Sequence, residues 1–211
     1  MTVLEIDTPP GPARAHLHAA DDPMGALVLG HGAGGGVEAP DLVAVTDVPV
    51  SAGFSVALVE QPYRVAGRRS PAPAGQLDAA WTAVVSRLRG DELSGLPMIA
   101  GGRSAGARVA CRTAAETGAV AVLCLAFPLH APGGAATGKT RQPELDAVAV
   151  PCLVVQGRSD PFGMPRASST RTVVEVEGNH SLKTDLDAVG AAVREWLAGL
   201  RTSAAAARSP R

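Results

Sequence analysis

Long apolar runs are missing from this sequence of 211 residues. No run reaches the roughly 20 residues that a membrane-spanning helix needs. The opening segment, Met1 to Asp7, has neither the basic residues nor the apolar core of a secretory signal. We therefore expect a cytoplasmic protein that does not associate with a membrane.

The sequence also lacks an excess of charge of either sign. It holds 19 Lys and Arg residues against 20 Asp and Glu residues, and its formal net charge is −1 at pH 7. A protein that binds nucleic acid through the phosphate backbone needs a basic field. The composition therefore argues against a nucleic-acid partner. Lysine is rare, with only Lys139 and Lys183, so arginine supplies the other basic residues.

Cysteine is scarce as well. Cys111, Cys124 and Cys152 form an odd set without paired spacing, which argues against a disulfide framework and predicts buried, reduced thiols. The sequence contains no Cys-x-x-Cys pair and no His/Cys cluster, so it predicts neither a metal nor a cofactor. Nothing in it indicates an oligomeric state.

Short apolar runs alternate with longer segments of helical character. Such short runs suit strands that are covered on both faces, and the alternation predicts a mainly parallel α/β sheet with helices on both faces. The expected strands are 26–29, 56–59, 97–100, 120–125, 152–155 and 172–176. The expected helices are 40–52, 76–88, 104–117 and 183–200.

The chain is long enough for one substantial core. With 46% hydrophobic residues, it suits a single domain over residues 1–200. Residues 201–211 have little apolar bulk and predict a disordered C-terminal tail. Residues 3–17 are expected to add an antiparallel edge hairpin, although Pro9, Pro10 and Pro12 weaken that prediction.

Two loops rich in proline follow expected strand ends, at 61–75 and 127–142. Open α/β sheets bind ligands at the carboxyl ends of their strands. We therefore expect these loops to form the rim of a site. Neither loop is long enough to form a separate cap domain.

The most informative motif is Gly102-Arg103-Ser104-Ala105-Gly106, which directly follows an apolar run. A nucleophilic serine on a sharp strand-to-helix turn needs small neighbours, because the backbone is crowded there and the hydroxyl must stay exposed. Chance alone gives a G-x-S-x-G motif roughly 0.15 times in a chain of this composition. The interpretation of this motif as a nucleophilic turn therefore depends on the residues around it and further along the chain.

The context supplies a base and an acid for Ser104. A serine hydroxyl needs a histidine to take its proton and an acidic group to orient that histidine. Asp160 and His180 each follow an expected strand, at separations of 56 (160 − 104) and 20 (180 − 160) residues. Taken singly, each is also compatible with an ordinary turn. Their joint placement predicts a triad of Ser104, Asp160 and His180.

An oxyanion hole requires backbone N–H groups near the nucleophile. Ala105 is expected to supply one, and Ala33 or Gly34 the other, from the glycine-rich segment 30–36. Dense glycine lets amides approach a ligand closely, and it is also compatible with a flexible turn. His31 precedes the nucleophile in the chain and is expected to support this loop rather than act as the base.

With these residues in place, the chain resembles a family of small α/β-hydrolase-like proteins related to dienelactone hydrolases. It most resembles the testis-expressed hydrolase-like proteins and the hydrolase-like domain of a subunit of the non-specific lethal acetyltransferase complex. The resemblance covers roughly residues 26–200. It is carried by the segments 29–35, 101–108, 126–130, 156–163 and 178–183. It implies the α/β-hydrolase fold and a triad at 104, 160 and 180.

The predicted function is hydrolysis of an ester or thioester of a small substrate through an acyl-enzyme intermediate. The alternative is a hydrolase-like protein that binds a protein or small ligand without efficient chemistry. Arginines near the expected site favour an anionic substrate, and solvated side chains are the competing interpretation. The predicted substrate-binding residues are Tyr63, Arg64, Arg68, Arg69, Arg103, Phe127 and His130.

Overall fold

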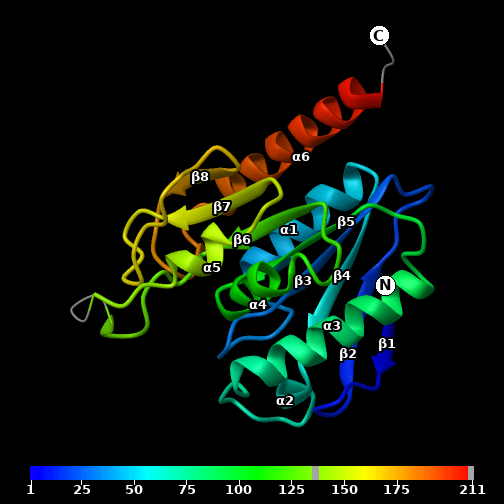
Figure 1. The fold of residues 1–211 in the computed structure, drawn as a ribbon, viewed down its shortest axis with the longest axis horizontal. Helices are drawn as coiled ribbons and strands as arrows, with labels where there is room; N and C mark the ends of the chain where they lie inside the picture. The colour runs from blue at the N-terminus through cyan, green and yellow to red at the C-terminus, as the bar shows by residue number, and fades with distance from the viewer. Residues whose placement is uncertain (135–137, 209–211) are drawn as a thin grey trace.

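The short apolar runs become strands of one sheet in the computed structural model, which describes residues 1–134 and 138–208; in that part of the chain the sheet has eight strands (Figure 1). Their spatial order is β1-β2-β4-β3-β5-β6-β7-β8. The strands are β1 Thr2–Ile6, β2 Ala13–His18, β3 Gly25–Gly30, β4 Phe54–Glu60, β5 Met98–Arg103, β6 Ala121–Leu125, β7 Cys152–Gly157 and β8 Arg171–Val176.

The sheet is parallel from β4 to β8, as the alternation predicted. Every residue of β3 and β6 is buried, because helices cover both faces of these central strands. In the register of β3 and β5, Gly30 is opposite Gly102. The pairing therefore brings the start of the glycine-rich loop beside the Gly-x-Ser-x-Gly motif.

The predicted N-terminal hairpin is confirmed. β1 and β2 pair antiparallel, and β2 pairs antiparallel with β4. Pro9, Pro10 and Pro12 lie between the two strands, where they interrupt no backbone ladder. The prolines that weakened the prediction belong to the turn.

Helices cover the sheet on both faces (Figure 1). Trp81 of α3 and Val109 of α4 pack into one core, and Leu42 of α1 and Val193 of α6 pack into the other. No separate cap domain is present in the described part of the chain. The helices are α1 Pro40–Ser51, α2 Pro62–Val65, α3 Ala74–Gly90, α4 Ala105–Thr113, α5 Gln142–Asp146 and α6 Leu186–Arg208.

The helix ends differ from the expected ones. α6 ends at Arg208 rather than near residue 200, in a segment rich in alanine, the strongest helix former. The structure therefore has helix over residues 201–208, where the sequence predicted a disordered tail. Residues 209–211 of the predicted tail lie outside the described residues. The short helices α2 and α5 lie at the two expected rim loops, of which residues 135–137 are also outside the described part.

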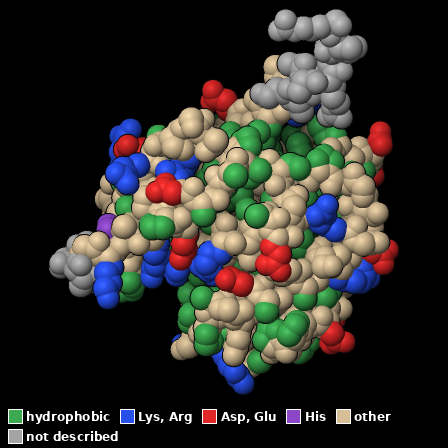
Figure 2. Space-filling view, in the orientation of Figure 1, with side chains coloured by type: hydrophobic (Ala, Val, Ile, Leu, Met, Phe, Trp, Pro, Cys, Tyr) green, Lys and Arg blue, Asp and Glu red, His purple; other side chains and the backbone are tan. Residues whose placement is uncertain are grey.

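The surface agrees with the balanced composition. On the face shown in Figure 2, basic and acidic side chains are interspersed, and no broad field of one sign covers it. Within the described residues, no helix is long and apolar enough to cross a membrane.

Candidate active site

Ser104 lies at the turn between β5 and α4. Its φ of 52° and ψ of −108° are strained for a residue with a side chain. The two flanking glycines make this turn possible, since a Cβ at either Gly102 or Gly106 would collide with the carbonyl oxygen of Gly30. The motif therefore forms a strand-turn-helix elbow that packs backbone against backbone.

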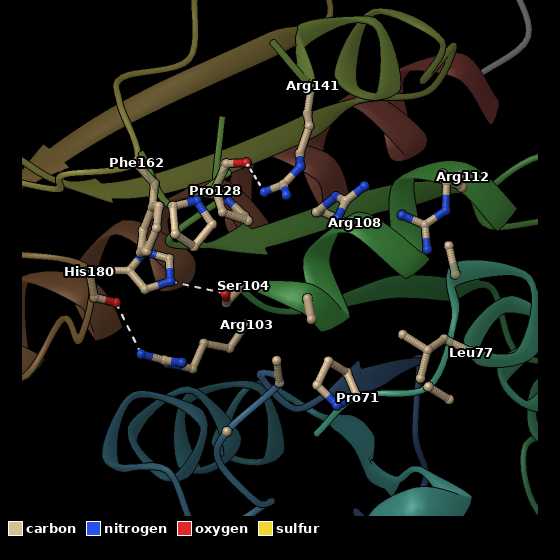
Figure 3. Close-up of a pocket in the computed structure, with 16 residues that line it drawn as sticks. Pro71, Leu77, Arg103, Ser104, Arg108, Arg112, Pro128, Arg141, Phe162 and His180 are labelled. Atoms are coloured by element: carbon tan, nitrogen blue, oxygen red, sulfur yellow. Dashed lines mark hydrogen bonds between the residues drawn. The ribbon is translucent and has the colours of Figure 1, made fainter. Parts of the chain in front are cut away.

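The structure brings Ser104, His180 and Asp160 together. The Nε2 atom of His180 lies 2.9 Å from the Ser104 hydroxyl oxygen (Figure 3). Its Nδ1 atom lies 2.8 Å from Oδ2 of Asp160. The Asp160 side chain is 1% exposed and the His180 side chain 17%. With Nδ1–H donating to the carboxylate, Nε2 is left to accept the hydrogen bond from the serine hydroxyl.

Asp160 is held by two further donors. Nε2 of Gln156 donates to Oδ2 at 2.8 Å, and the backbone N–H of Phe162 donates to Oδ1 at 2.8 Å. The Phe162 ring packs edge-on against the His180 ring, with centroids 4.4 Å apart. These contacts fix both the carboxylate and the imidazole. Sequence reasoning gave no role to Gln156 or Phe162, although both lie in the segment 156–163 that carried the family resemblance.

His31 supports the glycine-rich loop, as predicted. Its Nδ1 atom lies 2.8 Å from the Gly32 carbonyl oxygen, and its Nε2 atom lies 3.1 Å from the Gln61 backbone nitrogen, which donates to it. This pattern requires the neutral ring with a proton on Nδ1. Burial lowers the pKa of His31, which favours the same form.

Tyr63 braces the same loop. Its hydroxyl donates to the Ala33 carbonyl oxygen at 2.9 Å, and burial raises its pKa to about 12. A neutral phenol therefore holds the peptide group that precedes Gly34. Ala33, Gly34 and Ala105 all line the cavity above Ser104, which is where the oxyanion donors were predicted.

Arg103 joins three parts of the site. Its Nε atom donates to Oδ2 of Asp41 at 3.0 Å. Its Nη2 atom donates to the His180 carbonyl oxygen at 3.1 Å (Figure 3). The Asp41 carboxylate is buried, which raises its pKa, and the Arg103 charge opposes that rise. Arg103 therefore ties the elbow to α1 and to the loop that carries His180.

A cavity of about 460 Å³ opens over Ser104. Its size suits a small organic ligand. Both charged and apolar side chains contribute to its walls (Figure 3). The described lining residues are Ala33, Gly34, Pro71, Ala72, Ala74, Leu77, Arg103, Ser104, Ala105, Arg108, Arg112, Pro128, Pro132, Arg141, Phe162 and His180. Both rim loops therefore contribute, as their positions predicted.

Of the seven predicted substrate-binding residues, only Arg103 is among the described residues that line this cavity. Phe127 is fully buried in the core. The His130 ring turns away to the Lys139 carbonyl oxygen, at 3.0 Å. Arg68 contributes to a separate cavity of about 110 Å³. The predicted residues that do not line the cavity above Ser104 are Tyr63, Arg64, Arg68, Arg69, Phe127 and His130.

Three arginines that the sequence reasoning missed line the cavity instead: Arg108, Arg112 and Arg141. Arg108 and Arg112 follow Ser104 at intervals of four residues, so the helix that begins at the elbow places them on one side. That spacing is visible in the sequence and could have identified both. Arg141 precedes α5, and no comparable pattern marks it.

The cysteines lie away from this cavity. All three are free and buried in the core, as predicted, with 3.5 Å between the sulfur atoms of Cys111 and Cys124. Their mutual hydrogen bonds and burial raise the pKa of Cys124. Within the described residues, no group of three or more His, Cys, Asp or Glu side chains could hold a metal ion.

The comparisons agree with this architecture. Residues 23–199 match the model of an alpha/beta hydrolase domain. The chain therefore belongs to the alpha/beta hydrolase family. None of the curated proteins compared with the sequence matches it.

Several solved structures share the fold. A serine hydrolase homologue from Coxiella burnetii superposes with a TM-score of 0.76 at 16% identity, covering 93% of this chain and 97% of that one. A serine hydrolase without lid from Xanthomonas campestris has a TM-score of 0.72 at 18% identity, covering 92% of this chain and 94% of that one. A dienelactone hydrolase from Anabaena variabilis has a TM-score of 0.73 at 18% identity, covering 94% of this chain and 96% of that one. The finer resemblance to the testis-expressed and complex-subunit proteins stays a prediction.

Proposed function

We propose that the protein is a serine hydrolase that cleaves a compact ester or thioester through an acyl-enzyme intermediate. The observation that carries this proposal is the position of His180, whose two ring nitrogens lie within hydrogen-bond distance of Ser104 and Asp160. This is the geometry that nucleophilic catalysis by serine needs. A buried carboxylate that is already hydrogen-bonded also suits an orienting role better than a role in binding substrate.

In the first half-reaction, the Ser104 oxygen attacks the carbonyl carbon while His180 takes the hydroxyl proton. The resulting imidazolium stays beside the Asp160 carboxylate. When the tetrahedral intermediate collapses, the bond to the leaving group breaks and His180 gives its proton to the leaving oxygen or sulfur. An alcohol or thiol departs, and the acyl group remains on Ser104.

In the second half-reaction, water attacks the acyl-enzyme and gives a proton to His180. The bond to the Ser104 oxygen then breaks, and the proton returns to that oxygen, so a carboxylic acid leaves and the serine is restored. Ala105 and either Ala33 or Gly34 are the proposed backbone donors to the oxyanion in both steps. The hydrogen bond from Tyr63 to the Ala33 carbonyl favours a fixed loop, which an oxyanion hole requires.

The absence of a cap domain in the described residues favours small esters. The cavity of about 460 Å³ has room for a short acyl chain and a small leaving group. Peptide hydrolysis is less favoured, because the described residues include no added domain that could hold an extended polypeptide.

Labelling by a fluorophosphonate probe, together with turnover of a panel of short esters, tests the proposal. We expect a covalent adduct at Ser104, and a loss of roughly 10³-fold to 10⁶-fold in kcat for Ser104→Ala. Ser51→Ala, at an exposed serine on α1, is the matched control and should keep both labelling and rate. If the wild type forms no adduct, or if Ser104→Ala keeps its rate, the proposed function is wrong.

A further inference from the structure

Four arginines contribute to the cavity above Ser104, and no Asp or Glu is among its described lining residues. Figure 3 shows Arg141, Arg108 and Arg112 in a row on one side, with Pro71 and Leu77 on the opposite side. A cationic row therefore faces an apolar wall formed by Pro71 and Leu77, while Pro128 and Phe162 lie beside Arg141 and Arg103 lies below Ser104 (Figure 3). An ester that fills this cavity contacts both walls.

Three of the four arginines already have carboxylate partners behind the wall. Arg103 pairs with Asp41, Arg108 makes a two-pronged ion pair with Glu144, and Arg112 makes another with Asp78. Arg112 also approaches the same Glu144, at 3.4 Å. These contacts explain why the arginines are held in place, and they neutralise three of the positive charges.

Arg141 has no such partner in the described part of the chain. Its Nη1 atom donates to the carbonyl oxygens of Pro128 and His130, at 3.0 and 3.1 Å. No carboxylate of the described residues lies within ion-pair distance of it, and its Nη2 and Nε atoms have no hydrogen-bond partner there. The two carbonyls hold the guanidinium and leave its other donors to the cavity.

Arg141 therefore differs from the other lining arginines. Arg103, Arg108 and Arg112 are paired with carboxylates, whereas Arg141 has no ion-pair partner among the described residues. Burial lowers the pKa of Arg141, and repulsion from Arg108 lowers it further. Attraction to Glu144 raises this pKa and offsets only part of the decrease. Arg141 nevertheless stays protonated at neutral pH, because a guanidinium does not release its proton in that range.

We propose that the cavity selects a compact ester that carries a single carboxylate, and that Arg141 binds that carboxylate. This inference rests on the proposed hydrolase function. A carboxylate accepts two parallel hydrogen bonds from the Nε and Nη2 edge of a guanidinium, and that edge of Arg141 has no hydrogen-bond partner among the described residues. The apolar wall then contacts the carbon chain between the carboxylate and the ester.

Two pairs of esters test the charge preference. Mono-4-nitrophenyl adipate and 4-nitrophenyl hexanoate have equal acyl length and differ in the carboxylate, and 4-carboxyphenyl acetate and phenyl acetate place that difference in the alcohol. We expect the charged member of at least one pair to have roughly tenfold to 100-fold higher kcat/KM, the range for a hydrogen-bonded charge. The preference should shrink as salt is added. Equal kcat/KM within both pairs overturns the inference.

Variants assign the preference to one residue. In Arg141→Gln we expect the ratio of charged to neutral kcat/KM to fall to near one, and in Arg141→Lys to fall only in part, because lysine keeps the charge without the planar fork. Arg194→Gln is the control, since Arg194 is exposed on α6, on the opposite face of the sheet. It should keep both rate and ratio. A ratio that stays high in Arg141→Gln overturns the role of Arg141.

Binding separates this inference from the proposed function. Calorimetry with monomethyl adipate on Ser104→Ala reads the carboxylate site without any turnover. We expect measurable binding that weakens by about tenfold or more when Arg141→Gln is added. If no ester is hydrolysed but this loss is seen, the proposed function fails and the anion site stands. If esters are hydrolysed without charge preference and both variants bind monomethyl adipate equally, only the anion site fails.

Discussion

Ser104 and His180 are hydrogen-bonded to each other, yet different forces hold the segments that carry them. The elbow around Ser104 is fixed by backbone packed against backbone, with Gly102 and Gly106 both against Gly30. The loop of His180 also packs backbone against backbone, at Gly157. The His180 residue itself is held by side chains, through Asp160 and through the contact of Arg103 with the His180 carbonyl. Backbone packed against backbone leaves no room for an added atom. Side-chain hydrogen bonds, by contrast, can be removed one partner at a time. The two halves should therefore respond differently to substitution.

The largest effect is expected at the elbow. In Gly106→Val, the new side chain meets the backbone of Gly30 and His31, neither of which can rotate away. We expect a loss of about 5 kcal/mol or more in the free energy of unfolding, because rigid backbone must separate. Gly90→Val, at the open end of α3, is the control and should cost about 1 kcal/mol or less. Equal denaturant midpoints for the two variants would show that the elbow is not sterically fixed.

A smaller effect, and one of a different kind, is expected at Arg103. Arg103→Met leaves the buried Asp41 carboxylate without its partner and releases the His180 carbonyl. A fully buried pair broken in this way costs 3–5 kcal/mol; Arg103 is 17% exposed, so we expect about 2–3 kcal/mol in urea unfolding. We also expect kcat to fall by about 100-fold with KM for a neutral ester little changed, because His180, the proposed base, is displaced.

The double variant Arg103→Met/Asp41→Leu separates these two consequences. Removing the orphaned carboxylate should restore much of the stability, because no buried charge remains unpaired. It should not restore kcat, since the contact with His180 is still missing. If kcat recovers together with stability, Arg103 acts on stability alone and has no part in positioning the base.

The smallest effect is expected at His31, and it depends on pH. Because the pKa of His31 is lowered in the folded protein, acid protonates the unfolded chain first. The stabilising contribution is therefore complete above the ordinary histidine pKa of about 6.5 and is lost as pH falls below it. Gln keeps one donor and one acceptor at this position. We expect the free energy of unfolding of His31→Gln to fall less than that of the wild type between pH 6.5 and pH 5, as measured by urea unfolding at each pH. Parallel pH curves for the two proteins would contradict this.

The sequence was informative where local chemistry dictates structure. The glycines of the elbow, the apolar central strands, and the placement of Asp160 and His180 after strand ends all depend on short-range patterns. The parallel sheet then gathers strand ends at one edge, so that residues distant in the chain meet.

Prediction was weaker wherever the outcome depends on which side a loop residue faces. Arg64, Arg68 and Arg69 follow a strand end just as a binding residue would, but the loop carries them away from the cavity. Arg141 enters the cavity because its backbone N–H donates to the Leu129 carbonyl and its side chain donates to two more carbonyls of the same loop. Those are tertiary contacts with no local signature. Arg108 and Arg112, by contrast, could have been found from their helical spacing from Ser104.

The position of β8 at the edge of the sheet has a consequence for how the protein would lose activity. β8 pairs only with β7 among the described strands, and the segment that carries His180 begins directly after it. Edge elements open locally at a lower free energy than the central strands, and Ser104 belongs to the centre. Partial opening at this edge would withdraw His180, the proposed base, while leaving the elbow around Ser104 folded. Inactivation and global unfolding are then separate events, and the first can be reversible even where the second is not.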